Sequence, residues 1–193
     1  MKRRTFKKVA LLVLMLFVLG IVAGCGGGAN EDKNAEPKTS EAGKIPVGLN
    51  VELSGGAATY GTDARDGALL AIEQINAAGG ILDKQLDPIV RDCKSIADEA
   101  MNVSAALMTK KIVAQIGPLT SGDVAGSTPI MMENKVPLVA PAATAVNVTV
   151  DEKTQKVRDY IFRVCFIDPF QGTLMAQFAA DNLKAKTAAI YKD

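Results

Sequence analysis

The feature that most constrains the fold is an alternation of short apolar runs with amphipathic segments, which begins at Ile45 and continues through the sequence. Each apolar run is long enough for a strand, and the segments between them have the apolar spacing and terminal residues of helices. Repeated strand–helix–strand units build a parallel sheet with helices over both faces. The pattern therefore predicts an α/β fold whose short apolar strands are buried on both sides.

The alternation predicts the following elements. The expected strands are 45–51, 86–91, 112–116, 136–140, 160–164 and 187–191. The expected helices are 61–78, 98–110, 121–134 and 169–183. Residues 145–159 break the rhythm and predict a long surface excursion.

Local signals support two of these helices. The apolar face of the first helix is expected to hold Ala68, Leu69, Ile72 and Ile75. Two consecutive glycines, Gly79 and Gly80, are expected to end this helix. Ser121 is expected to cap the start of helix 121–134.

The N-terminus has the organisation of a targeting segment. Residues 2–8 contain five basic side chains, and residues 9–23 form an apolar run interrupted only by Gly20. As a helix this run would span roughly 22 Å, less than the ~30 Å hydrocarbon core of a membrane. Residues 1–24 are therefore expected to be a signal peptide.

The end of this segment resembles the bacterial lipobox, in which a cysteine is acylated and becomes the first mature residue. The resembling residues are Val22-Ala23-Gly24-Cys25. An ordinary secretory signal followed by a chance cysteine is the alternative. We expect Cys25 to carry a lipid anchor, and residues 25–44, which are poor in large apolar side chains, to form a flexible tether above the membrane.

The charge balance argues against a nucleic-acid partner. The sequence has 22 basic and 21 acidic residues, and five of the basic ones precede Cys25, which leaves 17 against 21 and a net charge of −4. Phosphate backbones are bound by basic surfaces, and single strands by aromatic platforms. This chain lacks the first and, without tryptophan, offers little of the second.

Catalytic constellations are missing from the sequence. The chain has no histidine, which excludes Ser-His-Asp triads and histidine metal sites. Gly56 and Gly61 have the spacing of a phosphate-binding loop, but Thr62 stands where the lysine is required. The sequence thus predicts that the protein is not an enzyme and needs no cofactor. Five acidic residues are interpreted as helix caps or surface charges: Asp63, Asp66, Asp92, Asp123 and Asp168. Cys93 and Cys165 are expected to be free thiols, with a disulfide between them left open.

Three loops are expected to share one edge of the sheet, because each follows a strand. They are the first loop (53–61), the second loop (117–122) and the third loop (140–144), and all three are small, hydroxylated and free of formal charge. In open α/β sheets, ligands bind at this edge. Backbone N–H groups at the helix start near Ser121 favour an anion, and the Ser121 and Thr144 hydroxyls can serve either end of a zwitterion. Any one of these loops alone is better explained as an ordinary turn, but the three together at one edge favour an amino-acid site.

Several strings of the sequence resemble a known family when taken together. The strings are ELSGGAATYG, INAAGGI, IGPLTSG, VPLVAPAAT and FRVCFIDPFQG. They are similar to the type I periplasmic binding proteins of branched-chain amino acid ABC transporters. The resemblance implies a Rossmann-like lobe with a parallel sheet, an extracytoplasmic location, an amino-acid ligand held between two lobes, and delivery to a membrane permease.

The resemblance also implies particular residues and boundaries. It assigns the amino-acid clamp to Ser121 and Thr144, a backbone contact to Ala142 with Ala143 beside it, and a place near the ligand side chain to Tyr60. Residues 45–163 would form the first lobe, still incomplete, and 164–193 only the first helix and strand of the second. Since family members are about twice as long, the resemblance implies a truncated member. A disulfide of some members is absent, because Ser95 and Thr120 occupy the matching positions.

Two alternatives stay open at this stage. A ligand-sensing subunit that reports to a membrane receptor would share these features with a transport protein. Other small solutes, such as amides, urea or aromatic acids, are also compatible with the loops.

Overall fold

The computed structural model describes residues 43–191, which contain a parallel five-stranded sheet in the order β2-β1-β3-β4-β5. The strands are β1 (Ile45–Val51), β2 (Leu86–Asp92), β3 (Ala114–Ile116), β4 (Leu138–Ala140) and β5 (Ile161–Arg163). The helices are α2 (Ala58–Ala77), α3 (Ala97–Met108), α4 (Ser121–Asn134) and α5 (Asp168–Asp181), with a 3-10 turn, η1, at Val146–Val148. The predicted α/β fold with a parallel sheet is confirmed.

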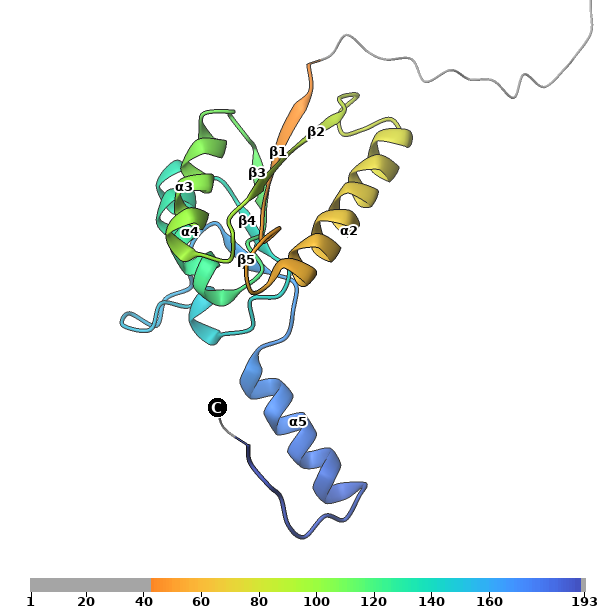
Figure 1. Cartoon of the computed structure of the whole chain (residues 1–193), viewed down its shortest axis with the longest axis vertical. Helices are drawn as coiled ribbons and strands as arrows, with labels where there is room; N and C mark the ends of the chain where they lie inside the picture. The colour runs from red at the N-terminus through yellow and green to blue at the C-terminus, as the bar shows by residue number, and fades with distance from the viewer. Residues whose placement is uncertain (1–42, 192–193) are drawn as a thin grey trace, which may run out of the picture. The chain divides into compact units, whose positions relative to one another are not determined.

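Helices cover both faces of the sheet, with α2 on one side and α3 and α4 on the other (Figure 1). Each face has its own apolar core. Under α2 the buried side chains are Val47, Leu49, Ile72 and Leu86. Under α4 they are Val124, Met131, Leu138, Ala140, Ala143, Val148 and Ile161. Strands buried on both faces explain why the apolar runs of the sequence are nearly continuous.

The first helix differs from its prediction at its start and in its apolar face. It begins at Ala58, three residues before Gly61, and Ile75 near its end is exposed rather than buried. In this turn Asn76, four residues after Ile72, faces the sheet instead. The Asn76 carboxamide donates to the Leu86 carbonyl (2.9 Å) and accepts from the Leu86 N–H (2.7 Å). The predicted stop is correct, because Gly79 and Gly80 both have positive φ.

The predicted strand over 187–191 does not form. A strand is stabilised by pairing with a neighbour, and in the part of the chain that the structure describes no strand lies beside these residues. Ile190 and Tyr191 are accordingly exposed. Helix α5 is present as predicted, but none of its side chains is buried.

The excursion over 145–159 is more ordered than its polar sequence predicts. Val148 packs into the core under α4, and Val150 forms an isolated bridge with Val157. The Arg163 guanidinium donates hydrogen bonds to the carbonyls of Ala143 (3.2 Å) and Ala145 (2.6 Å). The excursion is therefore attached to β5 as well as to α4.

Within residues 43–191, no helix combines the length and the apolarity that crossing a bilayer requires. The predicted signal peptide, Cys25 and most of the predicted tether lie outside the described residues.

Candidate functional site

The three predicted loops meet at the carboxyl edge of the sheet around a hollow of about 220 Å³. The first loop and the start of α2 contribute Ala57 and Tyr60, the second loop Leu119 and Thr120, and the third loop Ala142. We call this the first hollow. None of its lining side chains carries a formal charge, and Tyr60 is 71% exposed beside it.

The first loop is fastened to the end of β2 by two side chains. The Asp92 carboxylate accepts hydrogen bonds from the backbone N–H groups of Leu53 (2.9 Å), Ser54 (3.2 Å) and Lys94 (2.7 Å), and from the Ser54 hydroxyl (2.7 Å). The Ser95 hydroxyl donates to the Ser54 carbonyl (2.8 Å) and accepts from the Ala57 N–H (3.0 Å). Ser95 thus holds this loop by hydrogen bonds.

These hydrogen bonds stabilise the ionised form of the Asp92 carboxyl group. Burial acts to raise the pKa of this carboxyl, but the hydrogen bonds from Ser54, Lys94 and Leu53 outweigh burial and hold the pKa below its usual value. The prediction that Asp92 is a cap or surface charge therefore understates its role, since the carboxylate organises a loop of the first hollow.

The second loop is fastened from beneath by two buried side chains. The Glu52 carboxyl, at the end of β1, accepts from the N–H groups of Leu119 (3.0 Å) and Thr120 (3.0 Å). The Gln115 carboxamide donates to the Gly117 carbonyl (3.0 Å). Gln115 belongs to β3, and Glu52 directly follows the last residue of β1.

Gln115 belongs to a buried polar network that joins the sheet to α3 and α4. The Ser104 hydroxyl on α3 donates to Gln115 (3.1 Å), and the Asn50 carboxamide of β1 donates to Ser104 (3.1 Å), to Ser127 on α4 (3.3 Å) and to the Ala100 carbonyl (2.9 Å). Directional bonds of this kind specify how the elements are aligned. The edge that carries the second loop is thus held in register with both helices.

The structure separates the predicted site residues into groups. Tyr60 and Ala142 line the first hollow. The methyl group of Ala143 is buried in the core, which leaves only its backbone for a ligand. Thr144 is half-buried, and its carbonyl accepts a hydrogen bond from the Asp168 N–H (3.2 Å) at the start of α5. The Ser121 hydroxyl accepts from the Ala145 N–H (3.2 Å), which links the second loop to the residue directly after the third loop.

Ser121 is not the helix cap that the sequence predicted. Thr120 is the N-cap, and its hydroxyl accepts from the Asp123 N–H (3.3 Å). Ser121 is the first helical residue, so its N–H and that of Gly122 precede the first intrahelical bond, from Val124 N–H to Thr120 O. Such amides at a helix start favour an anion.

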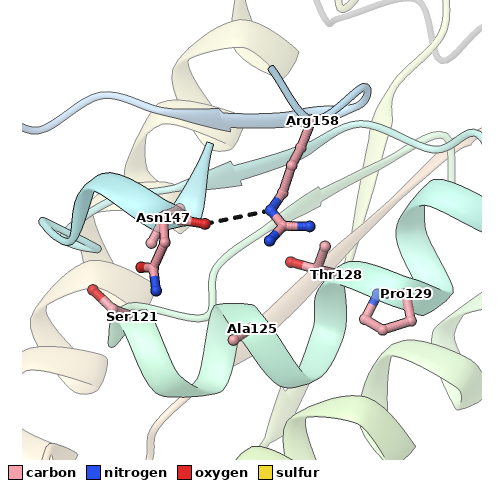
Figure 2. A pocket seen from close by; sticks show the side chains of 7 residues that line it. Ser121, Ala125, Thr128, Pro129, Asn147 and Arg158 are labelled. Atoms are coloured by element: carbon pink, nitrogen blue, oxygen red, sulfur yellow. Dashed lines mark hydrogen bonds between the residues drawn. The ribbon is translucent and has the colours of Figure 1, made fainter. Parts of the chain in front are cut away.

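A second hollow of about 150 Å³ lies along α4, and Figure 2 shows its lining. Ser121 sits at one end of it, and Asn147 and Arg158 of the excursion face α4 across it. The Arg158 guanidinium donates to the Asn147 carbonyl (3.3 Å) and pairs with Asp151 (3.2 Å). The charge of Arg158 is therefore already matched by Asp151.

Three buried residues behind the second loop were not recognised from the sequence. Glu52, Cys93 and Asp123 place one potential metal-ligand atom each within 4.8 Å of one another. Asp123, predicted to be a cap or surface charge, is only 4% exposed. Burial and the charge of Glu52 raise the pKa of the Cys93 thiol to about 12, so the thiol is neutral near pH 7. Cys93 and Cys165 are both free, as expected. An acidic residue directly after a buried apolar strand, as Glu52 is, was the signal available in the sequence.

Comparisons with known proteins agree with this geometry. The family model described as periplasmic binding protein matches residues 44–193. A leucine-, isoleucine-, valine-, threonine- and alanine-binding protein of Pseudomonas aeruginosa is 32% identical over 149 residues, which are 77% of this chain and 39% of the relative. A Leu/Ile/Val-binding protein of Rhizobium johnstonii is 30% identical over the same coverage of both chains.

Solved structures show the same likeness. A branched-chain amino acid transporter substrate-binding protein from Streptococcus pneumoniae, solved in complex with isoleucine, is 41% identical with a TM-score of 0.67, over 74% of this chain and 40% of that one. A leucine-binding protein from Thermotoga maritima is 35% identical with a TM-score of 0.62, over 74% and 38%. The chain thus spans about two fifths of the length of the relatives it matches.

Proposed function

The chain belongs to the periplasmic binding protein family, and from this premise we propose that it binds an amino acid, of the branched-chain class, for an ABC transporter. The observation that carries the proposal is the first hollow, where three uncharged loops meet at the carboxyl edge of a parallel sheet. Four similar proteins are named as binders of such amino acids or were solved with one. The proposed activity is binding without catalysis.

The chemistry of the hollow fits an aliphatic zwitterion. Ala57, Leu119 and Ala142 offer apolar surface to a hydrocarbon side chain, and the ring of Tyr60 lies beside it. We assign the ligand carboxylate to the helix-start amides of Ser121 and Gly122 together with the hydroxyls of Ser121 and Thr144. The Ser121 hydroxyl already accepts from Ala145, and it keeps its own proton to donate to a carboxylate. Ala142 and Ala143 contribute backbone groups in this assignment.

The rest of the proposal concerns location and partners. We propose that residues 1–24 are a signal peptide, that Cys25 is lipidated, and that residues 25–44 tether the protein to the outer face of the cell membrane. Residues 45–163 belong to one lobe and 164–193 to the next. Closure of two lobes over the ligand, a hinge motion, would present the loaded protein to permease subunits.

Backbone amide NMR of the 15N-labelled chain, titrated with isoleucine, tests the binding proposal. The method detects millimolar affinities, which suits a chain that spans about two fifths of its relatives. We expect shifts at the amides of Ser121, Gly122 and Thr144, and none with isoleucinol, which lacks the carboxylate.

Variants localise the effect. Ser121→Ala should reduce the response to isoleucine. Thr173→Val, an exposed change on α5 whose hydroxyl donates to the Pro169 carbonyl, should not. Equal shifts with isoleucine and isoleucinol, or shifts confined to Asn147, Arg158 and the residues of α4 after Gly122, would refute the assigned site.

A further inference from the structure

Three side chains of the kinds that bind metals converge behind the second loop, each from a different element. Glu52 directly follows β1, Cys93 directly follows β2, and Asp123 lies in the first turn of α4. Glu52 and Cys93 are 0% exposed, and Asp123 is 4% exposed. Within residues 43–191 neither carboxyl takes part in an ion pair. Buried carboxylates are costly unless they are paired or bind a metal, so the cluster favours a cation.

The Asp123 carboxyl gives an independent sign of a ligand. Its Oδ2 is buried and has no hydrogen-bond partner, and the side chain contributes an atom to the cluster. Asn50 Oδ1 is the other buried side-chain atom without a partner in residues 43–191. Asn50 lies on β1 two residues before Glu52, and its carboxamide donates to Ser127, one turn after Asp123 on α4. Both atoms are acceptors, and a cation would satisfy the carboxylate oxygen and balance its charge, whereas a water molecule would do only the first.

The dimensions of the cluster suit one small cation. The three ligand atoms all lie within 4.8 Å of one another. A point at the centre of such a triangle is at most about 2.8 Å from each atom, and zinc binds sulfur at about 2.3 Å and carboxylate oxygen at about 2.0–2.2 Å. Inward movements of less than about 1 Å therefore bring all three atoms into bonding distance.

Each of the three residues is already held in place by the backbone or by a cap. Glu52 Oε1 accepts from the Thr120 N–H (3.0 Å), and the Asp123 N–H donates to the Thr120 hydroxyl (3.3 Å). The Cys93 N–H donates to the Val51 carbonyl (3.0 Å). Surrounding hydrogen bonds of this kind orient metal ligands and increase metal affinity.

We propose that Glu52, Cys93 and Asp123 bind one divalent metal ion of the zinc class through the thiolate and one oxygen of each carboxylate. Calcium and magnesium sites use oxygen ligands alone, whereas a thiolate favours zinc-like metals. A water molecule takes the fourth position, as in other zinc sites with three protein ligands. The ion ties the ends of β1 and β2 to the start of α4 behind the second loop.

The electrostatics of the cluster agree with a cation. Burial and the charge of Glu52 raise the pKa of the Cys93 thiol, and a bound divalent cation reverses this repulsion. On binding, the thiol proton leaves to solvent and the sulfur bonds the metal. Two carboxylates, a thiolate and the ion carry one net negative charge, which faces the N–H groups of Leu119 and Thr120.

The experiment adds Co²⁺ to the full chain after treatment with a chelator. Co²⁺ replaces zinc in such sites, and its bond to a thiolate gives a charge-transfer band in the near ultraviolet. The chain has no histidine and three cysteines, so few positions can produce the band. Because the ligands are buried, the ion is supplied both to the folded chain and during refolding from urea. We expect one Co²⁺ per chain, with the band, and its loss when Zn²⁺ is added, since zinc binds more tightly.

Variants locate the ion. Cys93→Ser should abolish the band, whereas Cys25→Ser and Cys165→Ser, at the other two cysteines of the sequence, should retain it. Asp123→Asn should weaken Co²⁺ binding at least about tenfold, because the carboxamide carries no charge. Glu133→Gln, a matched control at an exposed site on α4, should not. The urea midpoint should rise with Zn²⁺ concentration in the wild type and not in Asp123→Asn.

Three results would overturn the proposal. They are the absence of the band under both ways of loading, a band that persists in Cys93→Ser, and equal Co²⁺ affinities of Asp123→Asn and Glu133→Gln. If the urea curve shows that Cys93→Ser does not fold, the last comparison decides by itself. No amino acid is used in these measurements, so their outcome is independent of the proposed function.

Discussion

Gly61 is the position at which α2 approaches the end of β1 most closely. A Cβ atom there would lie 1.8 Å from the carbonyl oxygen of Glu52 and 2.5 Å from its carbon, whereas real Cβ atoms keep at least 3.0 Å. The atoms in the way belong to the backbone, so no side-chain rotation can relieve the clash. Gly61→Ala therefore requires α2 and β1 to separate locally by at least 1.2 Å.

The same helix contains a matched control. Gly67 is exposed, and nothing lies within 4 Å of a Cβ built on it. Gly67→Ala should stabilise the fold by about 0.5–1 kcal/mol, because alanine loses less conformational freedom in a helix than glycine. Gly61→Ala gains the same helical preference, so its overpacking cost of about 3 kcal/mol appears as a net loss of about 2 kcal/mol.

Urea unfolding followed by circular dichroism measures both changes. The midpoint should fall for Gly61→Ala and rise for Gly67→Ala, with equal slopes that show an unchanged unfolded surface. Tyr60 adjoins Gly61, so the first variant should also shift the amide resonances around the first hollow. If Gly61→Ala lies within 0.5 kcal/mol of Gly67→Ala, the close packing of α2 on Glu52 is wrong.

Three further changes test the site and the anchor. Thr144→Val should weaken isoleucine binding by about 1–3 kcal/mol through a lost buried hydrogen bond, measured by calorimetry; an unchanged affinity would remove Thr144 from the clamp. Cys25→Ser should leave the protein unacylated and recoverable in the soluble fraction after membranes are washed, and retention in the membrane fraction would place the anchor elsewhere. Asp92→Ala should lower the urea midpoint of unfolding at neutral pH. The midpoint of this variant should also fall less steeply than that of the wild type as the pH is lowered into the acid range. The pKa of Asp92 is lowered in the fold, so the stability it contributes is present above its unfolded value of 3.8 and lost as the pH falls through the folded value; an acid limb identical to the wild type would contradict this.

The sheet was predictable because burial on both faces leaves a pattern that is continuous along the sequence. The runs around β1 and β2 and the glycines after α2 identified their elements within one or two residues. The strand predicted over 187–191 does not form, because a strand needs a neighbouring strand to pair with, and a local sequence pattern does not show whether that neighbour is present. The prediction that Ile75 lies on the buried face of α2 was wrong for a related reason. Asn76 takes the position facing the sheet because it forms two hydrogen bonds with the backbone there, and hydrophobic periodicity does not reveal such bonds.

The positions of the site loops could be predicted from the sequence, but the side chains that hold these loops in place could not. Small residues after strands identified where the hollow forms. The groups that hold these loops are acidic or polar residues far away in sequence, and a composition-based interpretation assigns such residues to the surface. Asp92 and Asp123 were assigned in that way, and Glu52 was not singled out. Only the fold shows that they face backbone N–H groups instead of water.

The fastening of both loops to the strands beneath them has a consequence for selectivity. Asp92, Ser95 and Glu52 immobilise the walls before any solute arrives, so association does not have to freeze those segments. In the proposed site, similar solutes would then face identical walls, and the preference among them would depend on how well each hydrocarbon chain fits against Tyr60, Leu119 and Ala142.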